Sequence, residues 1–371
     1  MTILEAKLET RQINNPAQQL DAWYTRCPVP TSFGIALQRG FLRDEFADDE
    51  SVTFRALQES SDPAILQSHY THTQRNSFRH GGNYPAIYAQ ATGANTKVIG
   101  LTFIRSSQTI LALPGSGING VKDLRGRRLL VPRRPHEPID HAYLSALRTY
   151  ETALRTEGLT LADVEIVERI ISTSYINDRL VQKTSHDAPE PKIQKKSTGG
   201  WTDTLFPLVR GEVDAIASGG SGSIQFQTLG GLQVVFDLSI LPLAEQANNN
   251  SPLVFAVKAD LLESHPELVA RVLRRSLQAE AQAKRDPNEA IRSVALELAL
   301  SERLVRHSSG ENFLPNLELD FSPFKIQALK SQAQFLWDKK AIPAPVDVDA
   351  WLAPELLGRV RDELNADSGN N

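Results

Sequence analysis

The chain has 371 residues, of which 41% are hydrophobic and 23% are charged, and its net charge is −4 at pH 7. This composition is typical of a soluble globular protein with room for two domains, and it excludes a disordered chain. The charges of both signs are spread along the chain and no apolar run approaches the roughly 18 residues of a membrane span, so we expect neither a nucleic acid nor a membrane as partner.

Short apolar strands are mixed with amphipathic helical patterns, which indicates an α/β fold. The polar segment 182–201 contains Pro and Gly, lacks periodicity, and predicts a loop that can act as a flap. From residue 265 onward the pattern is strongly helical. In chain order the expected elements are strands at 96–104 and 109–114, a short helix, a turn and a strand within 120–132, a helix at 143–158, a strand at 164–171, a helix and a strand within 202–218, and strands at 232–238 and 252–262.

Sulfur is almost absent from the sequence, because Cys27 is the only cysteine and Met1 the only methionine. Chance or a high-GC genome can explain this, but the pattern favours a protein made when sulfur is scarce. On that interpretation Cys27 is kept because something needs it, although a lone cysteine is usually a small buried hydrophobe. One cysteine allows no internal disulfide, and the polar N-terminal segment has no apolar signal region, so we expect a cytoplasmic protein.

Three stretches, in this order, carry a resemblance to a known superfamily: SGINGVKDLRGRRLLVP, LVRGEVDAIAS and FAVKADLLESHPELVARVLRRSLQAEAQAKRDPNEAI. They resemble the type II periplasmic-binding-protein superfamily, in particular its branch that captures nitrate, sulfonates and related anions. The resemblance implies two α/β lobes with a ligand in the cleft between them. We expect lobe I to comprise 1–115 and 231–371 and lobe II to comprise 116–230. A periplasmic protein needs an export signal, so a cytoplasmic relative with another task is expected.

The N-terminal quarter narrows the resemblance. YTRCPVPTSFGIALQRGFL and HYTHTQRNSFRHGGNYPAIYA look like the two motif regions of the 2'-hydroxybiphenyl-2-sulfinate desulfinase family, which performs the last step of dibenzothiophene desulfurisation, and AQFLWDKKAIPAPVDVDAWLAPELL looks like its closing segment. The resemblance covers roughly residues 20–355 and is weak at about 133–200. The residues that fall on the family pattern are Cys27, His69, Gln74, Arg79, Gly81 and Gly82.

These residue types suit the chemistry of a sulfinate, a compact anion with two oxygens. Arg79 offers a planar fork that can bind both oxygens, and the backbone at Gly81 and Gly82 is open to close approach. In this positive setting we expect the Cys27 thiolate to be stabilised. The thiolate could attack sulfur, or the thiol could protonate the ring carbon; the sequence does not choose. His69 would orient the substrate or tune Cys27.

The remaining signals have ordinary alternatives. Gln74 is expected to form a hydrogen bond to a residue that contacts the substrate, without contacting the substrate itself. His69, His72 and His80 could be read as a metal cluster, but they do not have the spacing of a standard metal site. Gly115, Gly117 and Gly120 form a G-x-G-x-x-G that we interpret as an interlobe turn. The SGGSGS run at 218–223 is either a flexible turn or the facing wall of the cleft. This run and the segment 131–141 depart from the family pattern, and both are expected to line the cleft and change the aryl group accepted.

The sequence therefore predicts a cofactor-free, metal-free aryl-sulfinate desulfinase, a hydrolase of carbon–sulfur bonds that releases sulfite from a small aromatic sulfinate and acts as a monomer. Two alternatives remain: a non-catalytic binding protein for sulfonates or similar organic anions, and a thiaminase-like or pyrimidine-synthase-like enzyme of the same fold. No motif for a pyrimidine or pyridoxal ligand supports the last one.

Overall fold

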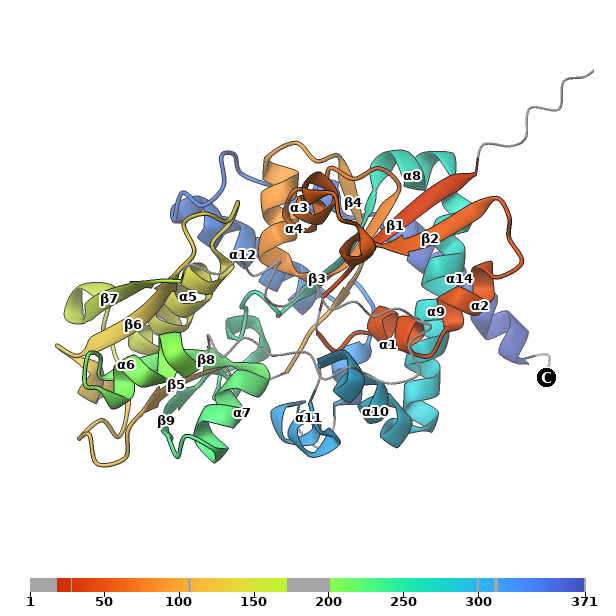
Figure 1. Cartoon of the computed structure of the whole chain (residues 1–371). Coiled ribbons are helices and arrows are strands. Elements are labelled where there is room, and N and C mark those ends of the chain that lie inside the picture. Colours follow the sequence, from red (N-terminus) through yellow and green to blue (C-terminus); the bar gives the residue numbers. More distant parts are fainter. Residues whose placement is uncertain are drawn as a thin grey trace, which may run out of the picture.

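The computed structural model describes residues 19–27, 29–105, 108–171, 201–298, 300–309 and 313–369. Ten strands of this part form two five-stranded sheets, which lie in the two halves of the molecule (Figure 1). The expected flap at 182–201 lies outside the described residues except at its last position. Among the described helices, none is long and apolar enough to cross a bilayer.

The first sheet, sheet A, has the strand order β2-β1-β3-β10-β4. Strand β1 runs parallel to β2 and β3, whereas β10 is antiparallel to both β3 and β4. Parallel neighbours end at the same edge, so the carboxyl ends of β1 and β3 meet. The strands are β1 (Leu20–Arg26), β2 (Val52–Ala56), β3 (Ser77–Gly82), β4 (Thr96–Thr102) and β10 (Leu253–Lys258).

The second sheet, sheet B, has the order β7-β6-β8-β5-β9. Strand β6 is parallel to β7 and β8, and β5 is antiparallel to β8 and β9. The chain thus crosses between the sheets after β4 and again after β9, and each crossing leads into an antiparallel strand. The strands are β5 (Gln108–Ala112), β6 (Arg128–Arg133), β7 (Glu165–Ile170), β8 (Ala215–Gly219) and β9 (Gln233–Asp237).

The crossings differ from the expected lobe boundaries. Division at 115/116 and 230/231 assigns β5 and β9 to lobe I, but both strands pair within sheet B. Their apolar pattern shows that they are strands without showing which sheet they join. The glycine-rich turn at Gly115 and Gly117, where φ is 76° and 79°, connects β5 to β6. It therefore lies within the sheet B half and is not an interlobe turn.

Helices cover the sheets, and their apolar stripes form the core. One cluster packs one face of sheet A against α1, α9, α10 and α14. A second cluster continues from the other face of sheet A, under α4 and α12, to sheet B and α5, so it joins the halves. The helices are α1 (Ser32–Gln38), α2 (Phe41–Phe46), α3 (Pro63–Thr71), α4 (Asn83–Ala91), α5 (His141–Arg155), α6 (Phe206–Val209), α7 (Gly220–Thr228), α8 (Ala259–Ser264), α9 (Pro266–Arg285), α10 (Pro287–Leu298), α11 (Glu302–Ser309), α12 (Pro323–Asp338), α13 (Val348–Trp351) and α14 (Glu355–Gly369).

From residue 96 onward the expected elements are confirmed with small changes of boundary. The segment 252–262 divides into β10 and α8, because Lys258 ends the strand and Ala259 begins a helix. The N-terminal strands β1, β2 and β3, two of which carry the motif residues, were not predicted from the sequence pattern.

Candidate active site

The two motif regions meet at the carboxyl ends of β1 and β3. The parallel register pairs Thr25 with Arg79 and the next residue with His80, so Cys27 follows beside Gly81. A Cβ atom at Gly81 would lie 2.2 Å from the Cys27 Sγ atom and 2.8 Å from its Cβ. The thiol therefore occupies the space that a side chain at Gly81 would need.

Arg79 points to the same face of sheet A as Gly81, because side chains two residues apart in a strand share a face. Its side chain is buried, with 4% of the residue exposed, and its Nη1 donates a hydrogen bond to the Gly82 carbonyl at 2.8 Å. The same Nη1 would lie 3.3 Å from a Cβ at Gly81. The guanidinium and the Cys27 thiol thus flank Gly81, and a positive charge is held close to the sulfur.

His69 and His72 belong to the same end of the site but come from α3. The Nδ1 of His69 lies 2.9 Å from the Thr25 hydroxyl, and Thr25 is the neighbour of Arg79 in the sheet. His72 follows α3 in a left-handed conformation with φ of 49°. Burial, and then the charge of Arg79, hold the pKa of both imidazoles well below 6.5, so both are neutral at pH 7.

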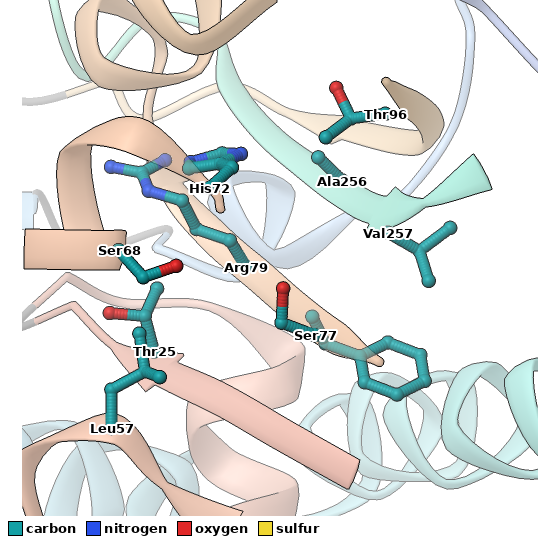
Figure 2. A pocket seen from close by; sticks show the side chains of 10 residues that line it. Thr25, Leu57, Ser68, His72, Ser77, Arg79, Thr96, Ala256 and Val257 are labelled. Atoms are coloured by element: carbon teal, nitrogen blue, oxygen red, sulfur yellow. The ribbon is translucent and has the colours of Figure 1, made fainter. Parts of the chain in front are cut away.

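Figure 2 shows Arg79 and His72 side by side, with Ser68 and Thr25 close to them, around a pocket of about 10 Å³. This volume is enough for about one water molecule and not for an aryl group. The pocket is therefore part of the immediate surroundings of the Arg79 side chain, and it is too small to bind an aromatic substrate.

His80 lies on the opposite face of β3. Its ring stacks on Phe255 with a centroid distance of 4.7 Å and an interplanar angle of 3°, and its Nε2 lies 3.1 Å from the Thr102 hydroxyl. The strand thus separates His80 from His69 and His72. Within the described residues no three His, Cys, Asp or Glu side chains are grouped so that they could hold a metal ion.

The protonation state of Cys27 differs from the expectation. Burial raises the pKa of the thiol above its ordinary value of 9.0, and the nearby Arg79, which lowers it, does not compensate; the carboxylate of Glu297 adds to the rise. The expected stabilisation of the thiolate by a positive setting is therefore outweighed by desolvation. The resting side chain is a protonated thiol.

Gly82 is covered in the same manner as Gly81, by a residue that the sequence analysis missed. A Cβ at Gly82 would lie 2.7 Å from Nδ2 of Asn249. The Asn249 carbonyl accepts from the Asn83 amide at 2.8 Å, and its Oδ1 accepts from the Tyr84 amide at 3.0 Å. At each of the two glycines a side chain from another segment therefore packs directly against the backbone of β3, so this backbone is not open. The NNN run at 248–250 before β10 was the signal that could have suggested this role.

Gln74 lies in the turn before β3. It is half-buried in the loop before β3, where its backbone amide donates to the Ser68 hydroxyl at 2.8 Å and its carbonyl accepts from the Ser77 hydroxyl. The length of β3 separates it from Gly81 and Gly82, since each strand residue adds about 3.3 Å. The hydrogen bonds of its backbone therefore place Gln74 in the turn that leads into β3.

A cavity of about 340 Å³ lies between the two halves next to the thiol, within the range of small-molecule pockets. From the sheet A half the lining comprises Val29 and Pro30, which follow Cys27 closely in the chain, the run 248–250, whose Asn249 covers Gly82, and also Ile104, Leu298 and Ser308. Cys27 itself is 9% exposed and does not belong to the lining. The lining from the sheet B half includes Gln108, Pro132, Arg134, His141, Ser145 and the run 217–221.

Two expectations about this cavity are confirmed. The SGGSGS run forms the end of β8 and the first turn of α7, and its first four residues line the cavity, so it is the facing wall. The segment 131–141 also contributes to the wall through Pro132, Arg134 and His141. The two segments that depart from the family pattern thus both contribute to the lining of this cavity.

Comparison with known proteins agrees with this geometry. No family model matches the chain. It is 25% identical to 2'-hydroxybiphenyl-2-sulfinate desulfinases of Rhodococcus erythropolis and Rhodococcus qingshengii, over 92% of this chain and 96% of theirs. A crystal structure of the C27S mutant of the desulfurization enzyme DSZB in complex with biphenyl-2-sulfinic acid superimposes with a TM-score of 0.71, 23% identity and coverage of 92% of this chain and 99% of that one.

The periplasmic aliphatic sulphonate binding protein SsuA of Escherichia coli is more distant, with a TM-score of 0.61, 16% identity and coverage of 91% and 92%. The predicted two-lobed α/β fold is therefore confirmed. The chain has the type II periplasmic-binding-protein-like fold and, over nearly its whole length, is similar in sequence to 2'-hydroxybiphenyl-2-sulfinate desulfinases.

Proposed function

We propose that this protein is an aryl-sulfinate desulfinase, which cleaves the carbon–sulfur bond of a 2'-hydroxybiphenyl-2-sulfinate-like substrate and releases sulfite and the hydroxylated aromatic. The observation that carries the proposal is the position of the Cys27 thiol and the Arg79 guanidinium on either side of Gly81, close in the chain to Val29 and Pro30, which line an interlobe cavity. The similarity to desulfinases over 92% of the chain supports the same activity.

Binding of the sulfinate is assigned to Arg79, whose planar fork matches two anionic oxygens. The Asn249 amide, which lies against Gly82, can add a donor, and helix α4 begins at Asn83 with its positive end at the same place. Because Arg79 is buried, its contact with an anion is screened little by solvent. The aryl group extends into the cavity, where it meets the facing wall.

The reaction consumes one water: an aryl sulfinate and water give the arene and bisulfite. In the route that we favour, the Cys27 S–H proton moves to the ring carbon that bears sulfur, and the electron pair of the carbon–sulfur bond returns to the ring as sulfur dioxide leaves. Water adds to sulfur dioxide to give bisulfite and a proton, and this proton restores the thiol. Arg79 stabilises the transient thiolate.

The protonated resting state of Cys27 supports this route over nucleophilic attack. Attack by sulfur first requires a thiolate, and burial disfavours that form. His69, which is neutral and hydrogen-bonded to Thr25, is suited to orient the reacting groups without adding a charge. We assign Cys27 as the proton donor, Arg79 as the anion-binding residue and His69 as the residue that orients them.

A binding protein for organic anions is the second candidate, since the fold is shared with sulfonate-binding proteins. Incubation of the purified protein with 2'-hydroxybiphenyl-2-sulfinate and simpler aryl sulfinates, followed by an assay for sulfite, separates the two. Catalytic release of sulfite is expected; tight binding without any turnover would establish the binding protein instead. We further propose a monomer that acts in the cytoplasm, which gel filtration and cell fractionation would test.

A further inference from the structure

A buried acid and a histidine form a pair in the sheet B half, and the histidine of the pair lines the cavity. Glu137 lies in the loop between β6 and α5, and His141 is the first residue of α5. The Nδ1 of His141 is 3.7 Å from Oε2 of Glu137, whose side chain is 2% exposed, and His141 lines the cavity. The Glu137 carboxylate therefore lies beside the Nδ1 edge of the His141 ring.

The pair is also tied to the half that carries the thiol. The Tyr70 hydroxyl, on α3, donates to the same Oε2 of Glu137 at 2.5 Å, and both residues are buried. Tyr70 follows His69, and the two rings pack edge to face with centroids 5.0 Å apart. One carboxylate thus connects the wall of the sheet B half to the helix that carries His69, and it sets the position of His141 across the cavity.

The chemistry of the pair indicates what it binds. The Glu137 carboxylate disfavours a second anion at the Nδ1 edge of His141, while the cation of the same loop, Arg134, lies elsewhere in the cavity lining. A hydroxyl group is suitable, since it both donates and accepts and can pair with the imidazole in either protonation state. The sulfinate is held by Arg79 in the other half, so the far ring of a biaryl substrate is the part that meets this wall.

We propose that His141, positioned by Glu137, binds a hydroxyl group on the far ring of the aryl sulfinate and makes the protein select hydroxylated substrates. This inference rests on the proposed desulfinase function for the identity of the ligand. It assigns His141 as a specificity residue that contacts substrate and Glu137 as its positioning residue.

The experiment compares two ligands that differ by this hydroxyl, 2'-hydroxybiphenyl-2-sulfinate and biphenyl-2-sulfinate. Their dissociation constants are measured by calorimetry on the full-length Cys27→Ser protein, alone and combined with His141→Phe, His141→Gln, Glu137→Gln or His136→Phe. His136 is an exposed histidine of the same loop that lies outside the cavity lining, so its replacement is the matched control. Sulfite release by the Cys27 protein, measured separately, reports on the proposed function.

We expect the hydroxylated ligand to bind about tenfold more tightly, which is the worth of one hydrogen bond. His141→Phe should remove this preference while the affinity for biphenyl-2-sulfinate stays within about twofold. Glu137→Gln should reduce the preference for the hydroxylated ligand. His141→Gln keeps a polar group and should retain most of this preference. His136→Phe should leave the preference unchanged. Equal affinities for the two ligands in the Cys27→Ser protein, or an equal loss for both in His141→Phe, would overturn the inference. Ligand preference without sulfite release would overturn only the desulfinase function.

Discussion

Replacement of Gly81 by alanine tests whether the thiol is held where catalysis needs it. The added Cβ would lie 2.2 Å from Cys27 Sγ and 2.8 Å from Cys27 Cβ, whereas carbon atoms in favourable contact are about 3.5–4.0 Å apart. Rotation of the thiol alone cannot relieve the contact with Cβ. The end of β1 must therefore move away from β3 by roughly 1 Å.

Such overpacking costs about 1–3 kcal/mol of unfolding free energy. A displacement of roughly 1 Å at a reacting group costs about a hundredfold in rate. We therefore expect Gly81→Ala to lower kcat for sulfite release by at least about a hundredfold while the protein remains folded at 25 °C. Urea unfolding and a continuous sulfite assay measure the two quantities on the same preparation.

Gly358 offers the matched control. It lies in the exposed part of α14, its φ is not in the left-handed region, and a Cβ there meets no atom within 4 Å. Gly358→Ala should raise the unfolding free energy by about 0.5–1 kcal/mol and leave kcat unchanged. Activity of Gly81→Ala within twofold of the parent protein would refute the assignment of the thiol beside Gly81 as the reacting group.

Three further predictions follow from the charges of the site. The rate of Cys27 alkylation by iodoacetamide should reach half of its maximum above pH 9.0. Arg79→Gln should move this midpoint to a higher pH, because it removes the charge that lowers the thiol pKa. A midpoint below pH 9 in the parent protein would contradict the argument that burial raises the thiol pKa. Burial, and then Arg79, lower the pKa of His80 to about 3, so the stability that neutral His80 contributes is complete above pH 6.5 and is lost as the pH falls toward 3. Urea unfolding between pH 7 and pH 4 should show a steeper loss in the parent protein than in His80→Gln, and equal slopes would contradict this. Arg79→Lys should weaken sulfinate binding and turnover together, by about 1.5–3 kcal/mol, since an ammonium does not replace a bidentate fork; unchanged kinetic constants would place Arg79 away from the anion.

The sequence predicted the strands after residue 96 because each of them contains a short apolar run. It did not predict β3, whose SFRHGG carries Arg79 and His80 at positions where a strand usually has apolar residues. Arg79 is buried and bonds to the Gly82 carbonyl, and His80 is buried and stacks on Phe255. A strand that supplies functional side chains to one face thus loses the alternation by which strands are recognised.

The resemblance to desulfinases predicted a site of Cys27, His69 and Arg79; the structure places Cys27 and Arg79 on either side of Gly81, and His69 beside Thr25, the neighbour of Arg79 in the sheet. Spacing along the chain could not show it, because contact depends on the register of β1 with β3. Asn249 and His141 come from distant segments, and of the two only Asn249 has a local signal, the NNN run at 248–250. The direction of the Cys27 pKa shift also could not be predicted, because burial of the thiol results from tertiary packing, which the local sequence does not show.

The most direct test of the account is sulfite release by the Cys27→Ser protein. A serine hydroxyl fills the same space but is a far weaker acid than a thiol. Turnover of 2'-hydroxybiphenyl-2-sulfinate should fall by at least about two to three orders of magnitude, the scale of losing an acid–base group, while calorimetry shows that the ligand still binds. Sulfite release at a rate near that of the parent protein would contradict the central claim that the Cys27 thiol carries the reaction.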